Sequence, residues 1–375
     1  MILKSVSVLG LFGSKPEVNY IFNDDLNIIT GRNGSGKTTI MKLAWFIVSG
    51  NILNALREIE FRSVTVETDL YKCSVFRTGP LTCRIELTTR KGTKTYEDSE
   101  VFDGDRDFFT PPKAAEDQVN PILRNEGGSI FFPTFRRIEG GFSMQQSTSS
   151  NRSRPWAIAE AEIDDILSSL SRRLTNKNHV FVSAISTEDV VSLLRKRFSE
   201  FSEEINKYQA KISKNVIDKI KVYQREESNR EYADTLLSET REEIEKIESF
   251  RSEKMRPFDA VTKLVENLFQ HSGISFGPRL NFGDAAEAVN SDVLSAGEKQ
   301  MLSFICYNAF TNDSIIFIDE PELSLHVDWQ RRLYPILHKQ NPKNQFIFAT
   351  HSPFIYGKYP DKEVALSADR GASDV

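Results

Sequence analysis

Cysteine is scarce in this chain: it has three, Cys73, Cys83 and Cys306, without the spacing of metal ligands. An odd, sparse set excludes a disulfide framework and is typical of a reducing cytosol. The sequence also lacks a signal-type N-terminus and any apolar run long enough to span a bilayer. We therefore expect a cytoplasmic protein without a membrane partner.

An excess of positive charge is also lacking, since 48 Lys and Arg residues stand against 53 Asp and Glu residues. The net charge of −5 disfavours a protein that coats nucleic acid nonspecifically, although a local basic face, and hence DNA contact, is left open. With 39% hydrophobic residues among 375, the chain can bury a sizeable core in one or two domains.

Glycine and proline are absent between Pro155 and Pro257. Within this stretch, apolar residues recur every three or four positions from Val190 to Val216, and charged residues and Gln fill most of the rest. This periodicity predicts a long amphipathic helix or an antiparallel pair of helices. We expect a helical insertion over residues 155–270, which separates an N-terminal half of a core (1–154) from a C-terminal half (271–375).

The chain does have a glycine-rich loop, Gly31-Arg-Asn-Gly-Ser-Gly-Lys-Thr-Thr39, between an apolar run typical of a buried strand and one typical of a helix. This context predicts a P-loop, in which backbone N–H groups and a helix N-terminus bind phosphates. Lys37 would contact the β- and γ-phosphates and so assist catalysis, and the Thr38 hydroxyl would bind Mg²⁺. The predicted nucleotide-binding residues here are Arg32, Asn33, Gly34, Ser35, Gly36, Lys37, Thr38 and Thr39.

Short strands are predicted around this loop, at residues 2–8, 19–22 and 26–30. Alternating apolar and polar residues at 61–68, 72–78 and 82–88 predict an antiparallel meander with one exposed face. The polar stretch 91–128 is expected to be a loop, and 129–132 a short strand. Arg136 and Arg137 follow, either as surface charge or as contacts to a phosphate or a partner.

Two further apolar strands end in residues suited to chemistry. Residues 314–320 end in Asp319 and Glu320, and residues 345–351 end in His351. Because parallel strands present ligand-binding residues at their carboxyl ends, Asp319 can lie beside Thr38 and hold Mg²⁺. Glu320 can then act on the attacking water, and His351 can sense the γ-phosphate. The structural alternatives are solvated acids and a packing histidine.

The segment Leu294-Ser-Ala-Gly-Glu-Lys-Gln300 opens another predicted helix. Ser295 and Glu298 fit a capping box, and the same helix N-terminus, with Ser295 and Gly297, can bind a phosphate. At this point the chain resembles the ABC-type ATPases, whose signature motif is similar. Glu320 to His326 resembles the segment after Walker B in SMC-like ATPases of bacterial defence proteins and overcoming-lysogenisation-defect nucleases, and His351 matches their switch histidine.

The resemblance implies an α/β fold: an ABC-ATPase-like P-loop core with a mixed central sheet, an antiparallel meander and the helical insertion. It implies ATP and Mg²⁺ as ligands. It also implies a homodimer or higher homo-oligomer in which Ser295, Gly297 and Glu298 of one protomer complete the ATP site of another. The implied role is the ATPase and sensor subunit of an antiphage system, such as the PARIS, Septu or retron types, with a separate effector nuclease or toxin and a phage trigger protein.

The chain departs from the family at some positions. His326 stands where the D-loop often carries Asp, and Gln145 and Gln146 are weak candidates for a Q-loop glutamine. Few acids follow His351, so we expect any nuclease on another chain. Two other functions are considered: a DNA-repair or recombination ATPase that clamps DNA directly, and the nucleotide-binding subunit of a transporter, which the helical insertion disfavours.

Overall fold

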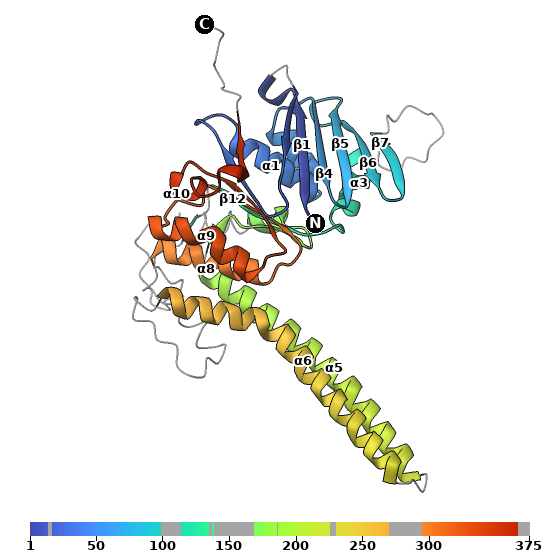
Figure 1. The fold of residues 1–375 in the computed structure, drawn as a ribbon. Helices are drawn as coiled ribbons and strands as arrows, with labels where there is room; N and C mark the ends of the chain where they lie inside the picture. Colours follow the sequence, from blue (N-terminus) through green and yellow to red (C-terminus); the bar gives the residue numbers. More distant parts are fainter. Residues whose placement is uncertain are drawn as a thin grey trace, which may run out of the picture. The chain divides into compact units, whose positions relative to one another are not determined.

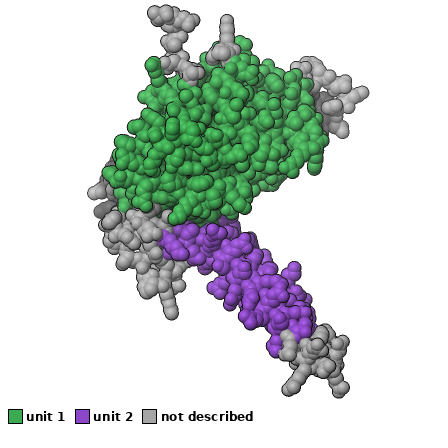
Figure 2. All heavy atoms as spheres, viewed as in Figure 1, with its two compact units in different colours: residues 1–186, 295–375 green, residues 187–294 purple. Residues whose placement is uncertain are grey.

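The computed structural model describes residues 1–13, 17–98, 114–134, 137–138, 169–185, 187–225, 230–269 and 295–366. The chain divides into two units, residues 1–186 with 295–375, and residues 187–294 (Figure 2). The first unit therefore joins sequence from both sides of the insertion. The side chains of Arg136, Arg137, Gln145 and Gln146 lie outside the described residues.

A six-stranded sheet, in the order β10-β8-β12-β13-β3-β14, forms the centre of the first unit, and every neighbouring pair in it is parallel. Strands β3, β12 and β13 are buried along their whole length, because parallel sheets are covered on both faces. The strands are β3 (Leu26–Thr30), β8 (Ser129–Phe132), β10 (His179–Phe181), β12 (Ile315–Asp319), β13 (Gln345–Ala349) and β14 (Glu363–Ala365).

The second sheet of this unit is antiparallel throughout, in the order β2-β1-β4-β5-β6-β7 (Figure 1). The predicted fold class is thus confirmed, with the parallel and antiparallel pairs in separate sheets instead of one mixed sheet. The strands are β1 (Leu3–Leu9), β2 (Val18–Ile21), β4 (Ser63–Thr68), β5 (Tyr71–Arg77), β6 (Cys83–Thr89) and β7 (Gly92–Glu97).

Helices pack on and between these sheets. Helix α1 (Lys37–Val48) contacts β8, β12 and β13 of the parallel sheet and β4 of the antiparallel sheet, and Trp45 on it packs against Phe131 and Phe181. The core of the unit therefore lies around α1. Other helices described in this unit are α2 (Ile52–Glu58), α3 (Ala115–Leu123), α8 (Ala296–Ala309), α9 (Val327–Gln340) and α10 (Pro353–Tyr356), with 3-10 turns η1 (Leu11–Gly13) and η3 (Pro360–Lys362). A short parallel pair, β9 (Arg137–Ile138) and β11 (Ala184–Ile185), also belongs to this unit.

The prediction of a loop over residues 91–128 is wrong at both ends, because β7 and α3 lie there. Strand β7 is an edge strand in which five of six residues are exposed, so it has no apolar period to reveal it. Helix α3 contains Pro121, which disfavours a helix in sequence, yet Val119 and Leu123 anchor it in the core.

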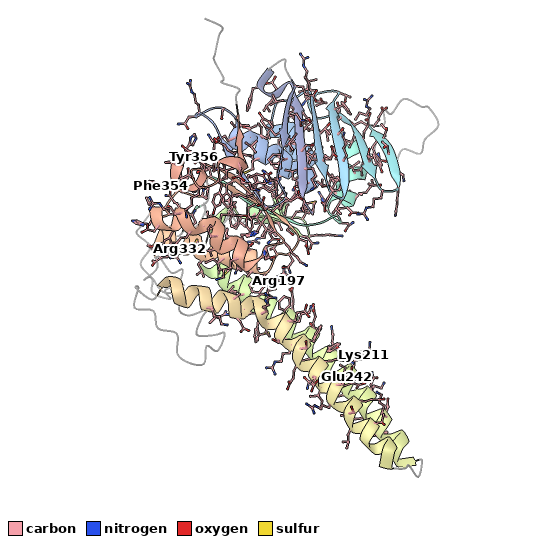
Figure 3. All side chains as sticks on the ribbon, in the orientation of Figure 1. Arg197, Lys211, Glu242, Arg332, Phe354 and Tyr356 are labelled. Carbon is pink, nitrogen blue, oxygen red and sulfur yellow. The ribbon has the colours of Figure 1, made fainter. Side chains whose placement is uncertain are left out.

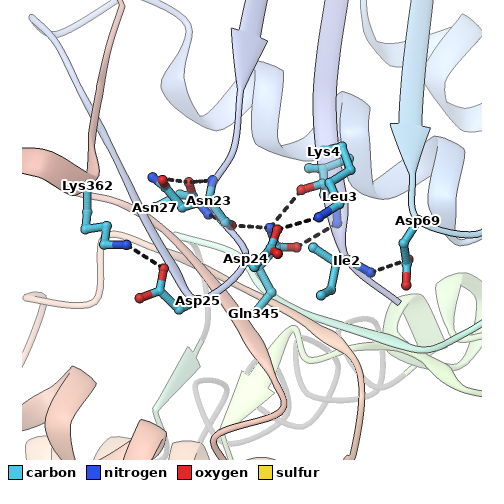
Figure 4. Close-up of polar contacts among 10 residues, drawn as sticks. All are labelled: Ile2, Leu3, Lys4, Asn23, Asp24, Asp25, Asn27, Asp69, Gln345 and Lys362. Carbon is cyan, nitrogen blue, oxygen red and sulfur yellow. Dashed lines mark hydrogen bonds and ion pairs between the residues drawn. The ribbon is translucent and has the colours of Figure 1, made fainter.

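Gln345, the first residue of β13, joins the two sheets (Figure 4). Its Oε1 accepts the N–H of Leu3 at 2.7 Å, and its Nε2 donates to the carbonyl oxygens of Leu3 at 2.8 Å and Asn23 at 2.7 Å. The amide is fully buried, and these bonds satisfy it. They fix β1 of the antiparallel sheet against the strand that ends next to His351.

The second unit is an antiparallel pair of helices, α5 (Thr187–Arg225) and α6 (Arg230–Phe269) (Figure 1). Tyr208 stacks on Phe250 with ring centroids 4.3 Å apart. No helix in the described ranges is long and apolar enough to cross a membrane. Strand β10 lies inside the range predicted for the insertion but belongs to the parallel sheet, so the structure moves that boundary to Ser186. A stretch without Gly or Pro does not distinguish a short strand from a helix.

Candidate active site

The P-loop leaves β3 and enters α1 through glycines in the left-handed region, Gly34 at φ 84° and Gly36 at φ 94°. Gly36 is the N-cap of α1 and provides no side-chain cap, and a Cβ there would lie 2.9 Å from the Phe12 ring. Other residues would be strained in both positions. The helix therefore presents its N-terminal N–H groups, and their partial positive charge, to the loop.

Lys37 is folded back over this loop. Its Nζ donates to the carbonyl oxygens of Gly31 at 3.1 Å and Arg32 at 3.3 Å, and lies 2.5 Å from Nε2 of His351. Burial lowers the pKa of Lys37, and the charges of Glu320, Asp319 and Glu322 oppose this shift. Hydrogen bonds from an ammonium group to a charged acceptor are stronger than those to neutral carbonyl oxygens. The Lys37 ammonium group is therefore suited to bind a phosphate.

Asp319, at the end of β12, is fully buried and lies beside Thr38 as predicted from the parallel strands. Its Oδ1 accepts the Thr38 hydroxyl at 3.0 Å, and its Oδ2 accepts the hydroxyl of Thr134. A carboxylate between two hydroxyls is an oxygen-rich set of the kind that Mg²⁺ prefers. The donor set therefore fits the ion, with Thr38 and Asp319 as the residues that would hold it. Sequence reasoning missed Thr134, which lies just beyond β8, the strand beside β12.

Glu320 occupies the left-handed region at φ 48°, where a residue other than glycine is uncommon. Its N–H bonds to the carbonyl oxygen of Ala349 at 2.8 Å, and its Oε1 lies 3.7 Å from Nε2 of His351. The pKa of Glu320 is raised to about 8, first by burial and then by the hydrogen bond and charge of Glu322. A carboxyl group with a raised pKa in a cavity is typical of a general acid or base.

His351 follows β13 and is held by Glu322, a residue that sequence reasoning did not select. Glu322 Oε1 accepts the backbone N–H of His351 at 2.7 Å, and its Oε2 accepts the Thr350 hydroxyl at 2.7 Å. Burial, and then the charge of Lys37, lower the pKa of His351. The neutral ring can therefore accept a hydrogen bond from the Lys37 ammonium group at Nε2.

Lys37, Thr38, Glu320 and His351 line one cavity of about 710 Å³, a volume in the range of small-molecule and cofactor sites. Of the predicted P-loop residues, Arg32 and Ser35 do not line it, and the buried Ser35 hydroxyl has no hydrogen-bond partner in the described part. The lining residues are Asn33, Gly34, Gly36, Lys37, Thr38, Thr39, Lys42, Phe131, Pro133, Thr134, Leu170, Phe181, Ser183, Glu320 and His351.

The predicted signature residues do not line this cavity. Ser295 caps α8: its Oγ accepts the N–H of Glu298 at 3.3 Å, and Glu298 Oε2 accepts the N–H of Ser295 at 2.7 Å. A Cβ on Gly297 would lie 2.3 Å from the carbonyl oxygen of Ser324. The capping box is thus present, and glycine at 297 is also required by packing, so these features by themselves do not establish a phosphate site.

The chain has a glycine-rich loop between a buried parallel strand and a helix, and an aspartate from another strand accepts the hydroxyl of the threonine that follows the loop lysine. This arrangement defines a P-loop nucleotide-binding protein. The family model described as "AAA domain, putative AbiEii toxin, Type IV TA system" matches residues 165–356, and one described as "AAA domain" matches residues 12–254. Both cover more than half of the chain. The chain therefore belongs to the AAA-domain ATPases, and the predicted resemblance to ABC/SMC-like ATPases of the defence type is confirmed at the family level.

Individual relatives are more distant. The "Retron Ec83 probable ATPase" of Escherichia coli is 37% identical over 73 residues, which span 16% of this chain and 14% of that protein. The Smc head domain of Pyrococcus furiosus, with an extended coiled coil and bound to the C-terminal domain of ScpA, is 14% identical, with a TM-score of 0.37 over 95% of this chain and 91% of that one. The SMC head domain of Thermotoga maritima has a TM-score of 0.36, 14% identity, and coverage of 95% and 92%. TM-scores this low do not bear on function.

Proposed function

We propose that this protein binds and hydrolyses ATP with Mg²⁺ in composite sites of a homodimer or larger homo-oligomer. We also propose that it is the ATPase and sensor subunit of an antiphage defence system, in which a separate effector responds to a phage trigger. The observation that carries the ATPase proposal is the convergence of Lys37, Thr38, Glu320 and His351 on one cavity. Asp319 lies behind this cavity and accepts the Thr38 hydroxyl.

The roles follow from this geometry. Lys37 would exchange its two carbonyl contacts for phosphate oxygens, and Thr38 with Asp319 would hold Mg²⁺, which neutralises charge on the phosphates. Glu320 faces the cavity from a strained turn and would orient the attacking water or accept its proton. His351, between Lys37 and Glu320, would contact the γ-phosphate.

Support for the assembly and the biological role is less direct. Ser295, Gly297 and Glu298 lie outside the cavity of their own chain, as residues that serve another protomer's site would. The defence role is supported by the description of the matching family and by the short match to a retron ATPase. The effector and the trigger are expected to be separate proteins.

Replacing Glu320 with Gln tests the ATPase proposal. The variant keeps the size of the side chain but cannot accept a proton, so ATP turnover should fall roughly 10²-fold or more. ATP binding, measured by isothermal titration, should survive. The control is Glu67→Gln, an exposed position on the antiparallel sheet, which should change neither quantity. Wild-type turnover in Glu320→Gln would exclude this role for Glu320, and a folded wild-type chain that does not hydrolyse Mg-ATP would contradict the proposed activity.

A further inference from the structure

Strand β14 lies at the edge of the parallel sheet in the described part of the chain, next to β3, the strand that enters the P-loop. It has three residues, of which Glu363 and Ala365 are exposed. Burial therefore does little to hold this strand in place, and elements of this kind open at a low cost in free energy. Its other contacts lie at the two ends of β3.

Leu366, the residue after β14, contacts the first residue of the P-loop. Its N–H donates to the carbonyl oxygen of Thr30 at 2.9 Å, and its side chain is buried in the core. Gly31 has φ 149°, and a Cβ on it would lie 3.2 Å from the carbonyl oxygen of Leu366 and 3.3 Å from its Cβ. Leu366 therefore packs closely on Gly31 and fixes the Thr30–Gly31 peptide.

Two side-chain contacts hold the same pair of strands together. The Thr30 hydroxyl donates to the carboxylate of Glu363. Lys362, just before β14, donates to Asp25, just before β3, at 2.8 Å (Figure 4). The segment is thus attached to β3 at both ends, by Lys362 where β3 begins and by Leu366 where it ends.

Lys37 joins this strand pair to the cavity. The carbonyl oxygen of Gly31 accepts a hydrogen bond from Nζ of Lys37 at 3.1 Å, and the same Nζ lies 2.5 Å from Nε2 of His351. The chain runs from His351 through α10, where Figure 3 marks Tyr356, and then through η3 into β14. One segment therefore contacts the P-loop at both of its ends, at Lys37 through His351 and at Gly31 through Leu366.

We propose that β14 and Leu366 position the P-loop, and that ATP binding and the pairing of β14 with β3 strengthen each other. This coupling depends on the proposed function of the P-loop as an ATP site. Because Leu366 fixes the Thr30–Gly31 peptide, the loop is preorganised, and less conformational freedom is lost when phosphates bind. Phosphates bound to the N–H groups of the loop in turn hold it in the conformation that packs on Leu366. Coupling between two equilibria is reciprocal, so each stabilises the other by the same factor.

Hydrogen exchange followed by mass spectrometry tests the coupling in the full-length chain. A non-hydrolysable ATP analogue with Mg²⁺, at a concentration that isothermal titration shows to be saturating, should slow the exchange of residues 363–366 about fivefold or more. The matched control is β7, the exposed edge strand of the antiparallel sheet, whose exchange should not change. Lys37→Ala, which lacks the P-loop cation, should show no response in either strand. Unchanged exchange of β14 with the analogue bound would overturn the proposal.

Substitution of Leu366 tests its positioning role. Leu366→Ala removes the buried anchor of the segment, so the Kd for Mg-ATP should rise about tenfold. The kcat should change less than about twofold, because the groups proposed to act on the attacking water are not on β14. Leu366→Met conserves the volume of the side chain and should restore most of the affinity. Leu87→Ala removes a similarly buried leucine from β6, and it should lower the melting temperature without changing the Kd.

Glu363→Ala tests the same role without a change in the core. Because Glu363 is exposed, the variant should keep the wild-type melting temperature, and the loss of its bond to Thr30 should raise the Kd about threefold. A wild-type Kd in both Leu366→Ala and Glu363→Ala, or a loss confined to kcat, would overturn the positioning role. A folded wild-type chain that binds no Mg-ATP would instead contradict the proposed function, on which the coupling depends.

Discussion

His179 illustrates how a single buried side chain links this fold to pH. It begins β10, lies opposite Ser129 of β8 with Nδ1 and the serine Oγ 2.8 Å apart, and is fully buried. Burial lowers the pKa of His179 to about 4. The imidazole is therefore neutral in the folded chain at pH values where it would be protonated in the unfolded chain.

The lowered pKa of His179 makes the folded chain less stable at acidic pH. Below pH 6.5 the unfolded chain binds the extra proton first, so the free energy of unfolding falls as the pH falls towards 4. At pH 5 this loss should be about 2 kcal/mol for His179 alone. His179→Asn keeps a polar atom near Ser129 but does not titrate, so its stability difference between pH 7.5 and pH 5 should be smaller by that amount.

Urea denaturation of both nucleotide-free proteins at the two pH values measures this difference. The asparagine variant is expected to be less stable at both, because it is smaller and leaves a cavity. The comparison therefore rests on the slope with pH. Equal slopes in the two proteins would mean that His179 does not set the pH dependence.

Among the elements, the segment after β12 is tied to its neighbours on several sides. Glu322 accepts hydrogen bonds from Thr350 and His351, and the carbonyl oxygen of Pro321 accepts one from Gln300 of α8 at 3.2 Å. The carbonyl oxygen of Ser324 lies against Gly297. The start of α8 and the loop that carries His351 are thus held by one short, rigid segment.

We predict that Glu322→Gln lowers kcat for ATP roughly tenfold, because one of two charge-assisted hydrogen bonds to the His351 loop is lost. The KM for ATP should change little, since Glu322 does not line the cavity. Thr350→Val removes one of the same bonds, so the double variant should cost less than the sum of the two single changes. Additive effects, or wild-type kcat in Glu322→Gln, would show that this tie does not position His351.

This network also explains which site residues sequence reasoning finds. Lys37, Thr38, Asp319, Glu320 and His351 were predicted because a motif or the end of a buried strand selects them. Thr134 and Glu322 were missed, because their importance depends on which strand lies beside which and on how a turn directs a side chain. Such contacts arise from tertiary register and carry no local pattern.

The same distinction holds for the fold. Apolar runs in the sequence predict buried strands such as β12 and β13, and the helical periodicity of apolar residues predicts the long helices. The exposed edge strand β7 and the three-residue strand β10 carry no such signal. Sequence therefore predicts the elements that the core covers, and it underestimates those at the sheet edges.

At the scale of the whole molecule, the separation of the two parts of the proposed ATP site is the feature with most consequence. The P-loop, Glu320 and His351 share one cavity, whereas the capped N-terminus of α8 lies outside it. If α8 serves the site of another protomer, ATP would bind between two chains and hold them together. Its binding would then need residues of both chains. A switch in assembly would then follow from nucleotide binding alone.

Mixing two inactive variants tests this arrangement. Lys37→Ala removes the cation of the P-loop, and Ser295→Arg blocks the N-terminus of α8, so each protein alone should be inactive. In a hybrid dimer, the P-loop of the Ser295→Arg chain meets the intact α8 of the Lys37→Ala chain, and that site carries neither change. At equal mixing, half of the dimers are hybrids with one intact site of two, so turnover should recover to roughly a quarter of the wild-type value.

Ser295 also caps α8, so a loss of activity in Ser295→Arg could arise from a weakened helix. Ser295→Asp separates the two causes, because aspartate is as good a cap but its charge repels a phosphate. We expect Ser295→Asp to be folded, inactive alone, and rescued by Lys37→Ala to the same extent as Ser295→Arg. The measurement is steady-state ATP turnover across mixing ratios, with hybrid formation verified by two affinity tags. Verified hybrids without any recovery would mean that each chain completes its own site.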